Sequence, residues 1–239
     1  MKGKVWLSSD EAVADIPDGA CVMIGGWTGP TSMPQNLILA LRDNGARDLT
    51  IVSAIMGLGG RNPLVPGATY IDPGILIENK QVRKGITSWA RSISPDVAAP
   101  VERAYLSGEI ELELVPMGTL LERIRAGGAG IGGFYTRIGA GTQLAEGKEE
   151  RLLGGQRYVL ELPLTADYAL IRAHRADTMG NLVYRGTSRY NCPAMAIAAR
   201  TTIVEVTEIV EPGEIDPNVI VTPGVYVDRI VQTAGVAGA

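Results

Sequence analysis

The sequence has few of the residues that build metal centres, disulfide scaffolds or membrane spans. Among its 239 residues there is one histidine, His174, and there are two cysteines, Cys21 and Cys192, too few for a zinc cluster or a disulfide framework. No apolar run approaches the roughly 20 residues of a transmembrane helix, and charges follow Met1 too closely for a signal peptide. We therefore expect no metal site and no membrane span, and a cytoplasmic location in which both cysteines stay reduced.

Positive charge and aromatic side chains are also scarce. The chain has 22 Lys and Arg against 26 Asp and Glu, for a net charge of −4, so no overall basic field is available to hold a phosphate backbone. Aromatic residues make up 5% of the chain, with a single phenylalanine, Phe134. We expect no nucleic-acid partner.

Glycine, in contrast, is abundant. The chain has 30 glycines, nearly twice the usual share of about 7%, yet long Val, Ile and Leu runs show that it is not a low-complexity sequence. So many glycines indicate tight strand-to-helix turns and places where the backbone passes close to a ligand or to another segment.

Apolar runs and helix signals alternate along the chain. The runs at residues 20–24, 49–53, 168–172 and 202–206 predict buried strands, and residues 110–114 alternate like a strand with one solvated face. Helix starts are predicted by Ser-Ser-Asp-Glu at 8–11 and Thr-Leu-Leu-Glu at 119–122, both capping-box patterns, and by Pro34 as the first residue of a helix that Gly45 ends. We expect a single α/β domain over residues 1–239, with an open, mostly parallel sheet covered by helices on both faces.

Two segments interrupt this alternation. Residues 57–74 contain three prolines and five glycines and predict a long excursion, of a kind that is commonly functional or mobile. Residues 151–159 predict a hairpin that turns at Gly154 and Gly155.

The glycine run at residues 127–133 has the spacing of a dinucleotide fingerprint at Gly128, Gly130 and Gly133. That fingerprint has meaning only when a strand precedes it and a helix N-terminus follows. Here a predicted helix precedes the run and an extended stretch follows. The order favours a loop whose backbone approaches a ligand or another chain.

Gly25 and Gly26 follow the predicted strand at 20–24, where the ligands of open α/β sheets bind. Residues 28–34 would then line a pocket, although an ordinary strand-to-helix turn explains the same pattern equally well.

The remaining polar candidates are each open to two interpretations. His174 follows a strand and is more typical of a structural histidine than of a catalytic base. Cys192 precedes a proline at a predicted helix start, which lowers a thiol pKa, but a packed and inert cysteine explains it as well. Arg185, Arg189 and Asn191 could hold a carboxylate or a phosphate, or could form a solvated loop.

Taken in order, these motifs resemble the A (alpha) subunit of family I coenzyme A transferases. Asp18-Gly19, a short apolar run and Gly25-Gly26-Trp27 look like the family signature. Further similar segments cover nearly the whole chain, at residues 45–50, 105–109, 115–120, 122–130, 133–136, 174–181 and 221–226.

The resemblance implies a three-layer sandwich and a reaction that moves coenzyme A from an acyl thioester to a carboxylate. In this family a glutamate attacks the thioester, and an enzyme–CoA thioester follows. That glutamate belongs to the B (beta) subunit, in a Glu-Asn-Gly type of motif. Residues 78–80 lack the glycine, so we expect no catalytic nucleophile here. A B subunit, an acyl-CoA and a small carboxylate are the implied partners, with CoA as a substrate and no tightly bound cofactor.

The resemblance also implies site residues, none of which is a proton-transfer group. The cleft would be lined by Gly25, Gly26, Thr28, Ala54, Met56, Met117 and Gly118. A glycine loop beside the thioester would comprise Gly127, Gly128, Gly130, Gly132, Gly133 and Phe134.

Some positions depart from the family pattern. Ala54 and Ile55 stand where relatives acting on 3-oxoacids commonly have paired asparagines, and Met117 stands where they commonly have glutamine. The turn after Gly26 is also about one residue longer, and Arg137 replaces a usual proline. Amide donors in such clefts are worth about 2.7–4 kcal/mol each. Other groups supply those donors, or the substrate is bulkier and more apolar, or the chemistry has drifted. A CoA-thioester hydrolase and a non-catalytic CoA- or nucleotide-binding module remain alternatives.

Overall fold

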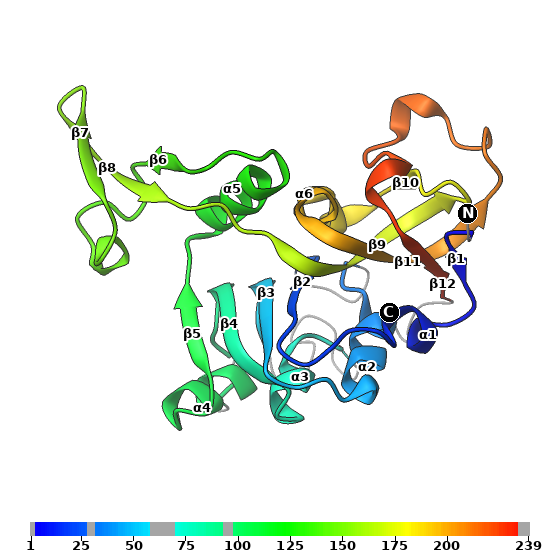
Figure 1. The fold of residues 1–239 in the computed structure, drawn as a ribbon, viewed down its shortest axis with the longest axis horizontal. Coiled ribbons are helices and arrows are strands. Elements are labelled where there is room, and N and C mark those ends of the chain that lie inside the picture. Colours follow the sequence, from blue (N-terminus) through cyan, green and yellow to red (C-terminus); the bar gives the residue numbers. More distant parts are fainter. Residues whose placement is uncertain (1–2, 28–31, 58–69, 93–97, 234–239) are drawn as a thin grey trace.

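The computed structural model describes residues 3–27, 32–57, 70–92 and 98–233 (Figure 1). Within them, a nine-stranded sheet forms the centre of the molecule. Its strands lie in the order β1 (Val5–Trp6), β12 (Arg229–Gln232), β11 (Ala199–Val210), β9 (Ala166–Asp177), β2 (Cys21–Ile24), β3 (Leu49–Ile55), β4 (Val82–Trp89) and β5 (Glu111–Leu114). All of these neighbours pair in parallel, and the ninth strand, β10 (Leu182–Val183), pairs antiparallel with β9. The predicted open, mostly parallel sheet is confirmed.

Helices cover both faces of this sheet, which makes three layers (Figure 1). One face carries α1 (Ser9–Val13), α2 (Gln35–Asn44), α3 (Gly74–Glu78) and α4 (Pro100–Leu106); the other carries α5 (Met117–Gly128) and α6 (Cys192–Ala198). Each face has its own apolar core, with Leu37 and Leu41 of α2 in one and Leu120 and Ile124 of α5 in the other. The strands between the two cores are therefore buried on both sides, as their continuous apolar runs predicted.

Local signals set most of the helix ends. The Ser8 hydroxyl accepts a hydrogen bond from the Glu11 N–H at the start of α1. Gly45, with φ = 80°, ends α2 in the left-handed conformation that favours glycine. Pro34 is the N-cap of α2 and not its first helical residue, and the helix runs from Gln35 to Asn44, as predicted.

The predicted start of α5 at Thr119 is wrong. The helix begins at Met117, after Pro116, because Pro116 has no N–H to continue the preceding strand and suits a helix entry. Thr119 therefore lies in the first turn with a buried hydroxyl, which has no hydrogen-bond partner among the described residues.

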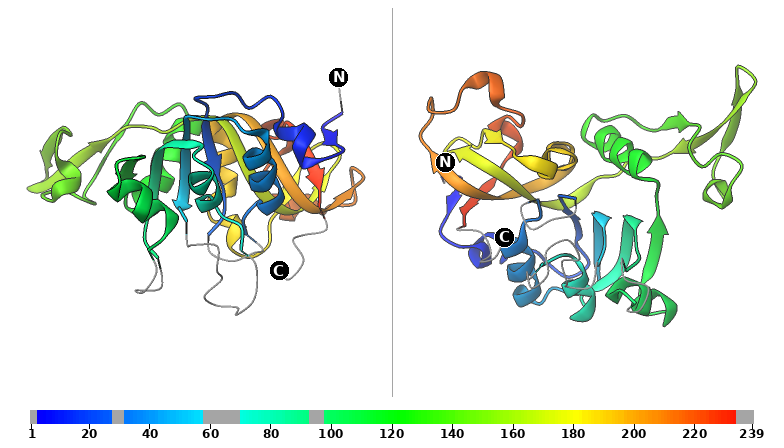
Figure 2. Two further views of the ribbon diagram at one scale, coloured as in Figure 1. Left: turned by 90° about the horizontal axis from the view of Figure 1, so that it is seen from below. Right: turned by 180° about the vertical axis from the view of Figure 1, so that it is seen from behind.

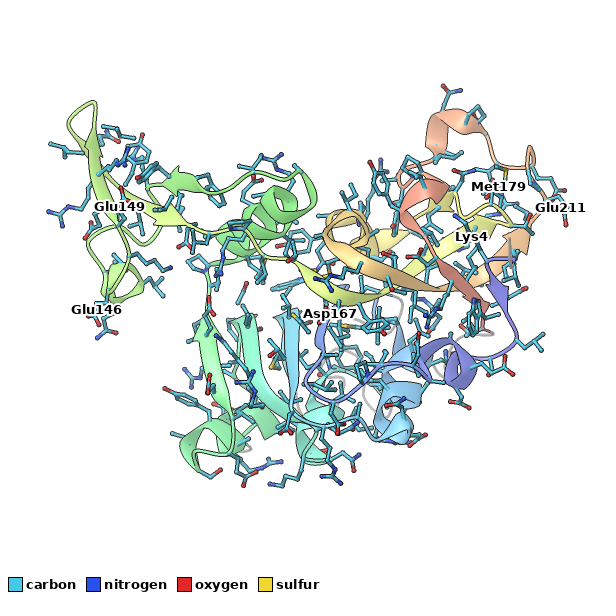
Figure 3. The ribbon with its side chains drawn as sticks, in the orientation of Figure 1. Lys4, Glu146, Glu149, Asp167, Met179 and Glu211 are labelled. Atoms are coloured by element: carbon cyan, nitrogen blue, oxygen red, sulfur yellow. The ribbon has the colours of Figure 1, made fainter. Side chains whose placement is uncertain are left out.

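A second, smaller sheet projects from the body (Figures 1 and 2). This arm, residues 134–161, contains β6 (Phe134–Thr136), η1 (Gln143–Ala145), β7 (Glu150–Leu153) and β8 (Gln156–Glu161), with strand order β6-β8-β7. Glu146 and Glu149 lie on the arm, well away from Asp167 on β9 (Figure 3). Gly154 and Gly155 both have positive φ and form the β7–β8 turn, which confirms the predicted hairpin.

The predicted excursion at residues 57–74 falls mostly outside the described residues. Its described C-terminal part leads into α3, which begins at Gly74. Short 3-10 helices complete the fold, namely η2 (Gly186–Arg189), η3 (Pro217–Val219) and η4 (Gly224–Tyr226). In the described part of the chain, no helix is long and apolar enough to cross a bilayer.

Candidate active site

The strand order reverses between β2 and β9, and this reversal defines the candidate site. From β2 the chain adds β3, β4 and β5 on one side, and from β9 it adds β11 and β12 on the other. Ligands of open α/β sheets bind at such a reversal, outside the carboxyl ends of the strands. The Gly25 N–H donates to the Leu170 carbonyl at 2.9 Å, so the segment after β2 lies at this point.

Gly25 and Gly26 are held tightly against the β9 side of the site. A Cβ on Gly25 would lie 2.6 Å from the Cys192 Sγ, and one on Gly26 would lie 2.4 Å from the Ser32 carbonyl oxygen. The Asn191 side chain accepts from the Gly26 N–H at 2.7 Å and donates to its carbonyl at 3.3 Å. Both positions therefore require glycine, and Asn191 holds the backbone in place.

A second set of contacts joins this segment to α5. The Thr187 hydroxyl donates to the Trp27 carbonyl at 3.4 Å, and the Tyr190 ring meets Trp27 edge-on at 6.3 Å. The Tyr190 hydroxyl donates to the Met117 carbonyl at 3.2 Å. Burial raises the pKa of Tyr190, which keeps this donor protonated. The structure thus brings together the end of β2, η2 and the start of α5, where Met117 is half-buried and Gly118 exposed.

Ala54 and Met56 lie deeper than a cleft lining. Their exposed fractions are 1% and 0%, because Ala54 is part of β3 and the Met56 N–H continues the ladder to the Trp89 carbonyl. A Cβ on Gly85 would lie 2.5 Å from the Met56 Sδ, so the Met56 side chain packs against β4. Thr28 lies outside the described residues.

The glycine run begins as the end of a helix. Gly127 and Gly128 form the last residues of α5. A Cβ on Gly127 would lie 2.2 Å from the Leu164 carbonyl oxygen, and one on Gly128 would lie 2.7 Å from the Ile197 Cγ2. These two glycines let α5 pack closely on the chain that enters β9 and on α6.

Gly130 and Gly132, later in the run, have free space around them. A Cβ on Gly130 or Gly132 would meet nothing within 4 Å, and Gly133 leads into β6, where Phe134 is half-buried. The run therefore follows a helix and precedes a strand, as predicted, which is the reverse of a dinucleotide fingerprint.

Glu205, a residue that the sequence reasoning missed, organises the other side of the reversal. This fully buried carboxylate of β11 accepts from the Asn36 and Leu37 N–H groups at 2.9 and 3.2 Å and pairs with the Arg172 guanidinium. It thereby supplies the N-terminal cap of α2, which Pro34 cannot provide. One acid inside the apolar run at 202–206 was the available signal, since a buried charge requires partners.

Cys192 is buried and Cys21 is half-buried, and the pKa of each thiol is raised. Burial outweighs the hydrogen bonds of nearby backbone groups and raises the pKa of Cys192 to about 12, which supports the inert interpretation. Burial and the neighbouring Asp167 carboxylate raise the pKa of Cys21 to about 11; Asp167 accepts from the Cys21 N–H at 3.0 Å.

The three residues of the predicted polar cluster, Arg185, Arg189 and Asn191, do not lie together at one site. Asn191 is buried under Gly26, whereas Arg185 and His174 line a hollow in which Arg189 takes no part. Neither Arg185 nor His174 has an acidic or hydrogen-bonded side-chain partner within the described part of the chain. The described residues contain no group of three or more His, Cys, Asp or Glu that could hold a metal ion.

Comparison with known proteins agrees with this geometry. Residues 7–233 match the family described as Coenzyme A transferase. The chain is 48% identical over 232 residues to the A subunit of a probable succinyl-CoA:3-ketoacid coenzyme A transferase of Bacillus subtilis, covering 97% of this chain and 91% of the relative. It is 45% identical over 239 residues to the A subunit of the 3-oxoadipate CoA-transferase of Pseudomonas putida, covering 100% and 97%.

A solved structure shares the fold. An acyl-CoA transferase of Escherichia coli O157:H7, in a thioester complex with CoA, superposes with a TM-score of 0.82 at 22% identity, over 99% of this chain and 49% of that chain. Sequence profile, relatives and fold agree, and the chain belongs to the coenzyme A transferase family as an A-type subunit.

Proposed function

We propose that this chain works with a B-type subunit to move coenzyme A from an acyl-CoA to a small carboxylate, with the attacking glutamate on the B-type subunit. The names of the relatives, each of which is an A subunit, support a second subunit. The observation that carries the proposal is that the buried carboxylate beside the site, Glu205, is already bound within the chain. It pairs with Arg172 and accepts hydrogen bonds from the N–H groups at the start of α2, so it is not free to attack a thioester.

The reaction needs one carboxylate nucleophile. The partner's glutamate attacks the thioester carbonyl carbon, and the CoA thiolate leaves to give an acyl-glutamyl anhydride. The thiolate then attacks the glutamyl carbonyl, which releases the acyl group as a carboxylate and leaves a glutamyl–CoA thioester. The acceptor carboxylate reverses these steps, so that CoA is a substrate and every bond broken is matched by one formed.

In this proposal the present chain shapes one wall of the cleft. Gly25, Gly26, Met117 and Gly118 line it, and Ala54 and Met56 support its floor from the core. The run from Gly127 to Phe134 lies beside the thioester, with its open members, Gly130 and Gly132, nearest to bound substrate. We further propose a cytoplasmic location, which fits two thiols that are free in the structure.

The test is turnover of the complex formed with a B-type subunit, followed with and without an acceptor carboxylate. We expect CoA transfer only when the acceptor is present, and no activity from either chain on its own. Steady release of free CoA without an acceptor would instead establish the hydrolase, which the apolar side chains at Ala54, Ile55 and Met117 favour. Binding of CoA with neither activity would leave a binding module.

A further inference from the structure

Residues 187–191, which lead from η2 into α6, contact both walls of the candidate cleft, and we call this segment the brace. On the β2 side, the Asn191 amide bonds to the main-chain N–H and carbonyl of Gly26, 165 residues away in sequence. On the α5 side, the Tyr190 hydroxyl donates to the Met117 carbonyl at 3.2 Å, 73 residues away. The brace therefore ties together two walls that come from distant parts of the chain.

The brace is itself held at both ends. At its start, the hydroxyl of the buried Ser188 donates to the Arg185 carbonyl at 2.9 Å. At its end, the Asn191 carbonyl accepts from the Met195 N–H at 3.0 Å in the first turn of α6. Cys192 and Met195 of α6 are completely buried. These contacts fix the brace to the body of the molecule, so that its side chains can hold other segments in place.

The start of α5 has no side-chain cap. Pro116, its N-cap, makes no side-chain hydrogen bond to the first turn, and a Cβ on Gly118 would meet nothing within 4 Å. The Tyr190 ring meets Trp27 edge-on while its hydroxyl bonds to Met117, so that one half-buried side chain touches both walls. Tyr190 thus supplies a side-chain contact that the start of the helix does not make for itself.

We propose that Tyr190 is a positioning residue for CoA transfer. Through Trp27 and Met117 it sets the distance between the two cleft walls, and so the fit between bound acyl-CoA and the glutamate of the B-type subunit. The inference rests on the proposed function, in which these walls hold the substrate. Reaction rates depend steeply on such alignment, and a displacement of about 1 Å can cost about 100-fold. Because Tyr190 acts through other residues, its loss should slow the reaction more than it weakens substrate binding.

The test is the Tyr190→Phe variant in the complex with a B-type subunit, since this change keeps the ring and removes only the hydroxyl. The probe is succinyl-CoA, with acetoacetate as the acceptor, and both transfer and release of CoA are followed. We expect kcat to fall about 10-fold and the KM for succinyl-CoA to change by less than about 2-fold.

Tyr168→Phe is the matched control. Tyr168 is also half-buried, and its hydroxyl also donates to a main-chain carbonyl, that of Asp15, at 3.1 Å. It lies near the amino end of β9, whereas the candidate cleft lies at the carboxyl ends of the strands. This variant loses a comparable hydrogen bond and should leave both kcat and KM unchanged.

Hydrogen exchange gives a readout that needs no turnover. The Leu120 N–H donates to the Pro116 carbonyl in the first turn of α5. In Tyr190→Phe the amides of this turn should exchange about 2- to 10-fold faster, as for one lost hydrogen bond. In Tyr168→Phe their exchange should stay as in the wild type.

The two readouts separate this inference from the proposed function. An unchanged kcat in Tyr190→Phe, a loss seen only in KM, or an equal loss of kcat in both variants overturns the inference even when the wild-type complex transfers CoA normally. If the wild-type complex neither transfers nor releases CoA, the proposed function fails and exchange alone tests the inference. Faster exchange at α5 in Tyr190→Phe only then supports Tyr190 as the residue that positions this wall, and equal exchange in the two variants overturns it.

Discussion

The nine-stranded sheet and the arm are built on different physical principles. In β9 most side chains are buried, and Leu170 is completely so. In β7 all four residues are exposed, and Leu152 keeps 73% of its surface in solvent. The sheet is stabilised by apolar burial on two faces, whereas the arm has almost no core of its own. The chain thus holds the candidate site on its most deeply buried sheet, and the arm that extends outward buries little apolar surface of its own.

A cluster of charged groups lies where the arm meets the body. Arg123 of α5 donates to the Glu113 carboxylate at 2.6 Å and to the Leu162 carbonyl at 2.9 Å. Glu161, buried at the end of β8, accepts from Lys148 at 2.6 Å and faces Arg123 at 3.8 Å. The ion pair between Glu161 and Arg123 therefore links the arm to α5, whereas α5 itself packs on the main sheet through apolar side chains.

The largest effect is expected in the buried charge pair of the main sheet. Glu205→Ala leaves Arg172 buried without its partner and two N–H groups of α2 unsatisfied, which should lower the free energy of unfolding by about 3–5 kcal/mol. Urea unfolding measures this loss. Glu208→Ala, which removes a more exposed ion pair on the same strand, should cost about 0–1 kcal/mol. Similar costs for the two variants would contradict the assigned role of Glu205.

Leucine truncation compares the two regions directly. Leu170→Ala empties a site in the core and should cost about 2–5 kcal/mol. Leu152→Ala on the arm should change the free energy of unfolding by no more than about 0.5 kcal/mol, because its side chain is mostly solvated. The same urea titrations serve, and a large cost at Leu152 would show that the arm has a core of its own.

The glycine run at residues 127–133 allows a tightly packed position and an open position to be compared within seven residues. Gly127→Ala would place a Cβ 2.2 Å from the Leu164 carbonyl oxygen and should cost about 1–3 kcal/mol through overpacking. Gly132→Ala, which meets nothing within 4 Å, should leave the melting temperature unchanged. If Gly132→Ala nevertheless lowers turnover of the complex, the open half of the run contacts substrate or partner.

The smallest effect is a pH dependence at the root of the arm. Burial raises the pKa of Glu113, but hydrogen bonds from Arg123 and Lys84 outweigh it and hold the pKa below its ordinary value of 4.5. The stabilisation is therefore complete above pH 4.5 and is lost as the pH falls through the lowered folded-state pKa. As the solution is acidified below pH 4.5, the melting temperature of the wild type should fall more than that of Glu113→Gln. Parallel plots of melting temperature against pH for the two proteins would show that the Glu113 carboxylate contributes no stability.

Sequence patterns predicted β2, β3, β9 and β11 because these strands contain continuous apolar runs, and β5 because its residues alternate. They missed β4, in which polar and exposed residues interrupt the apolar ones, and the short strands β1, β10 and β12. They also predicted the start of α1 and the end of α2, where Ser8 and Gly45 act locally. They failed at Thr119 because the preceding Pro116 starts the helix first. They missed Glu205 and most of the arm because the partners of Glu205 are distant in sequence, and because solvated strands such as β7 lack the apolar pattern of buried ones.

In the candidate site, too, local features were predictable from the sequence and contacts between distant segments were not. Gly25 and Gly26 were identifiable at the end of an apolar strand, but the clamp by Asn191 joins segments 165 residues apart. The two roles within the glycine run could not be separated from the sequence, since packing against Leu164 depends on the tertiary fold.

The central claim is that this chain forms a coenzyme A transferase site without supplying its nucleophile. The most direct measurement is the intact mass of both chains of the complex, taken once acyl-CoA has been added without an acceptor carboxylate. We predict a CoA-sized adduct on the B-type subunit that disappears when a carboxylate is added, and an unmodified mass for this chain. A CoA adduct on this chain would contradict the account.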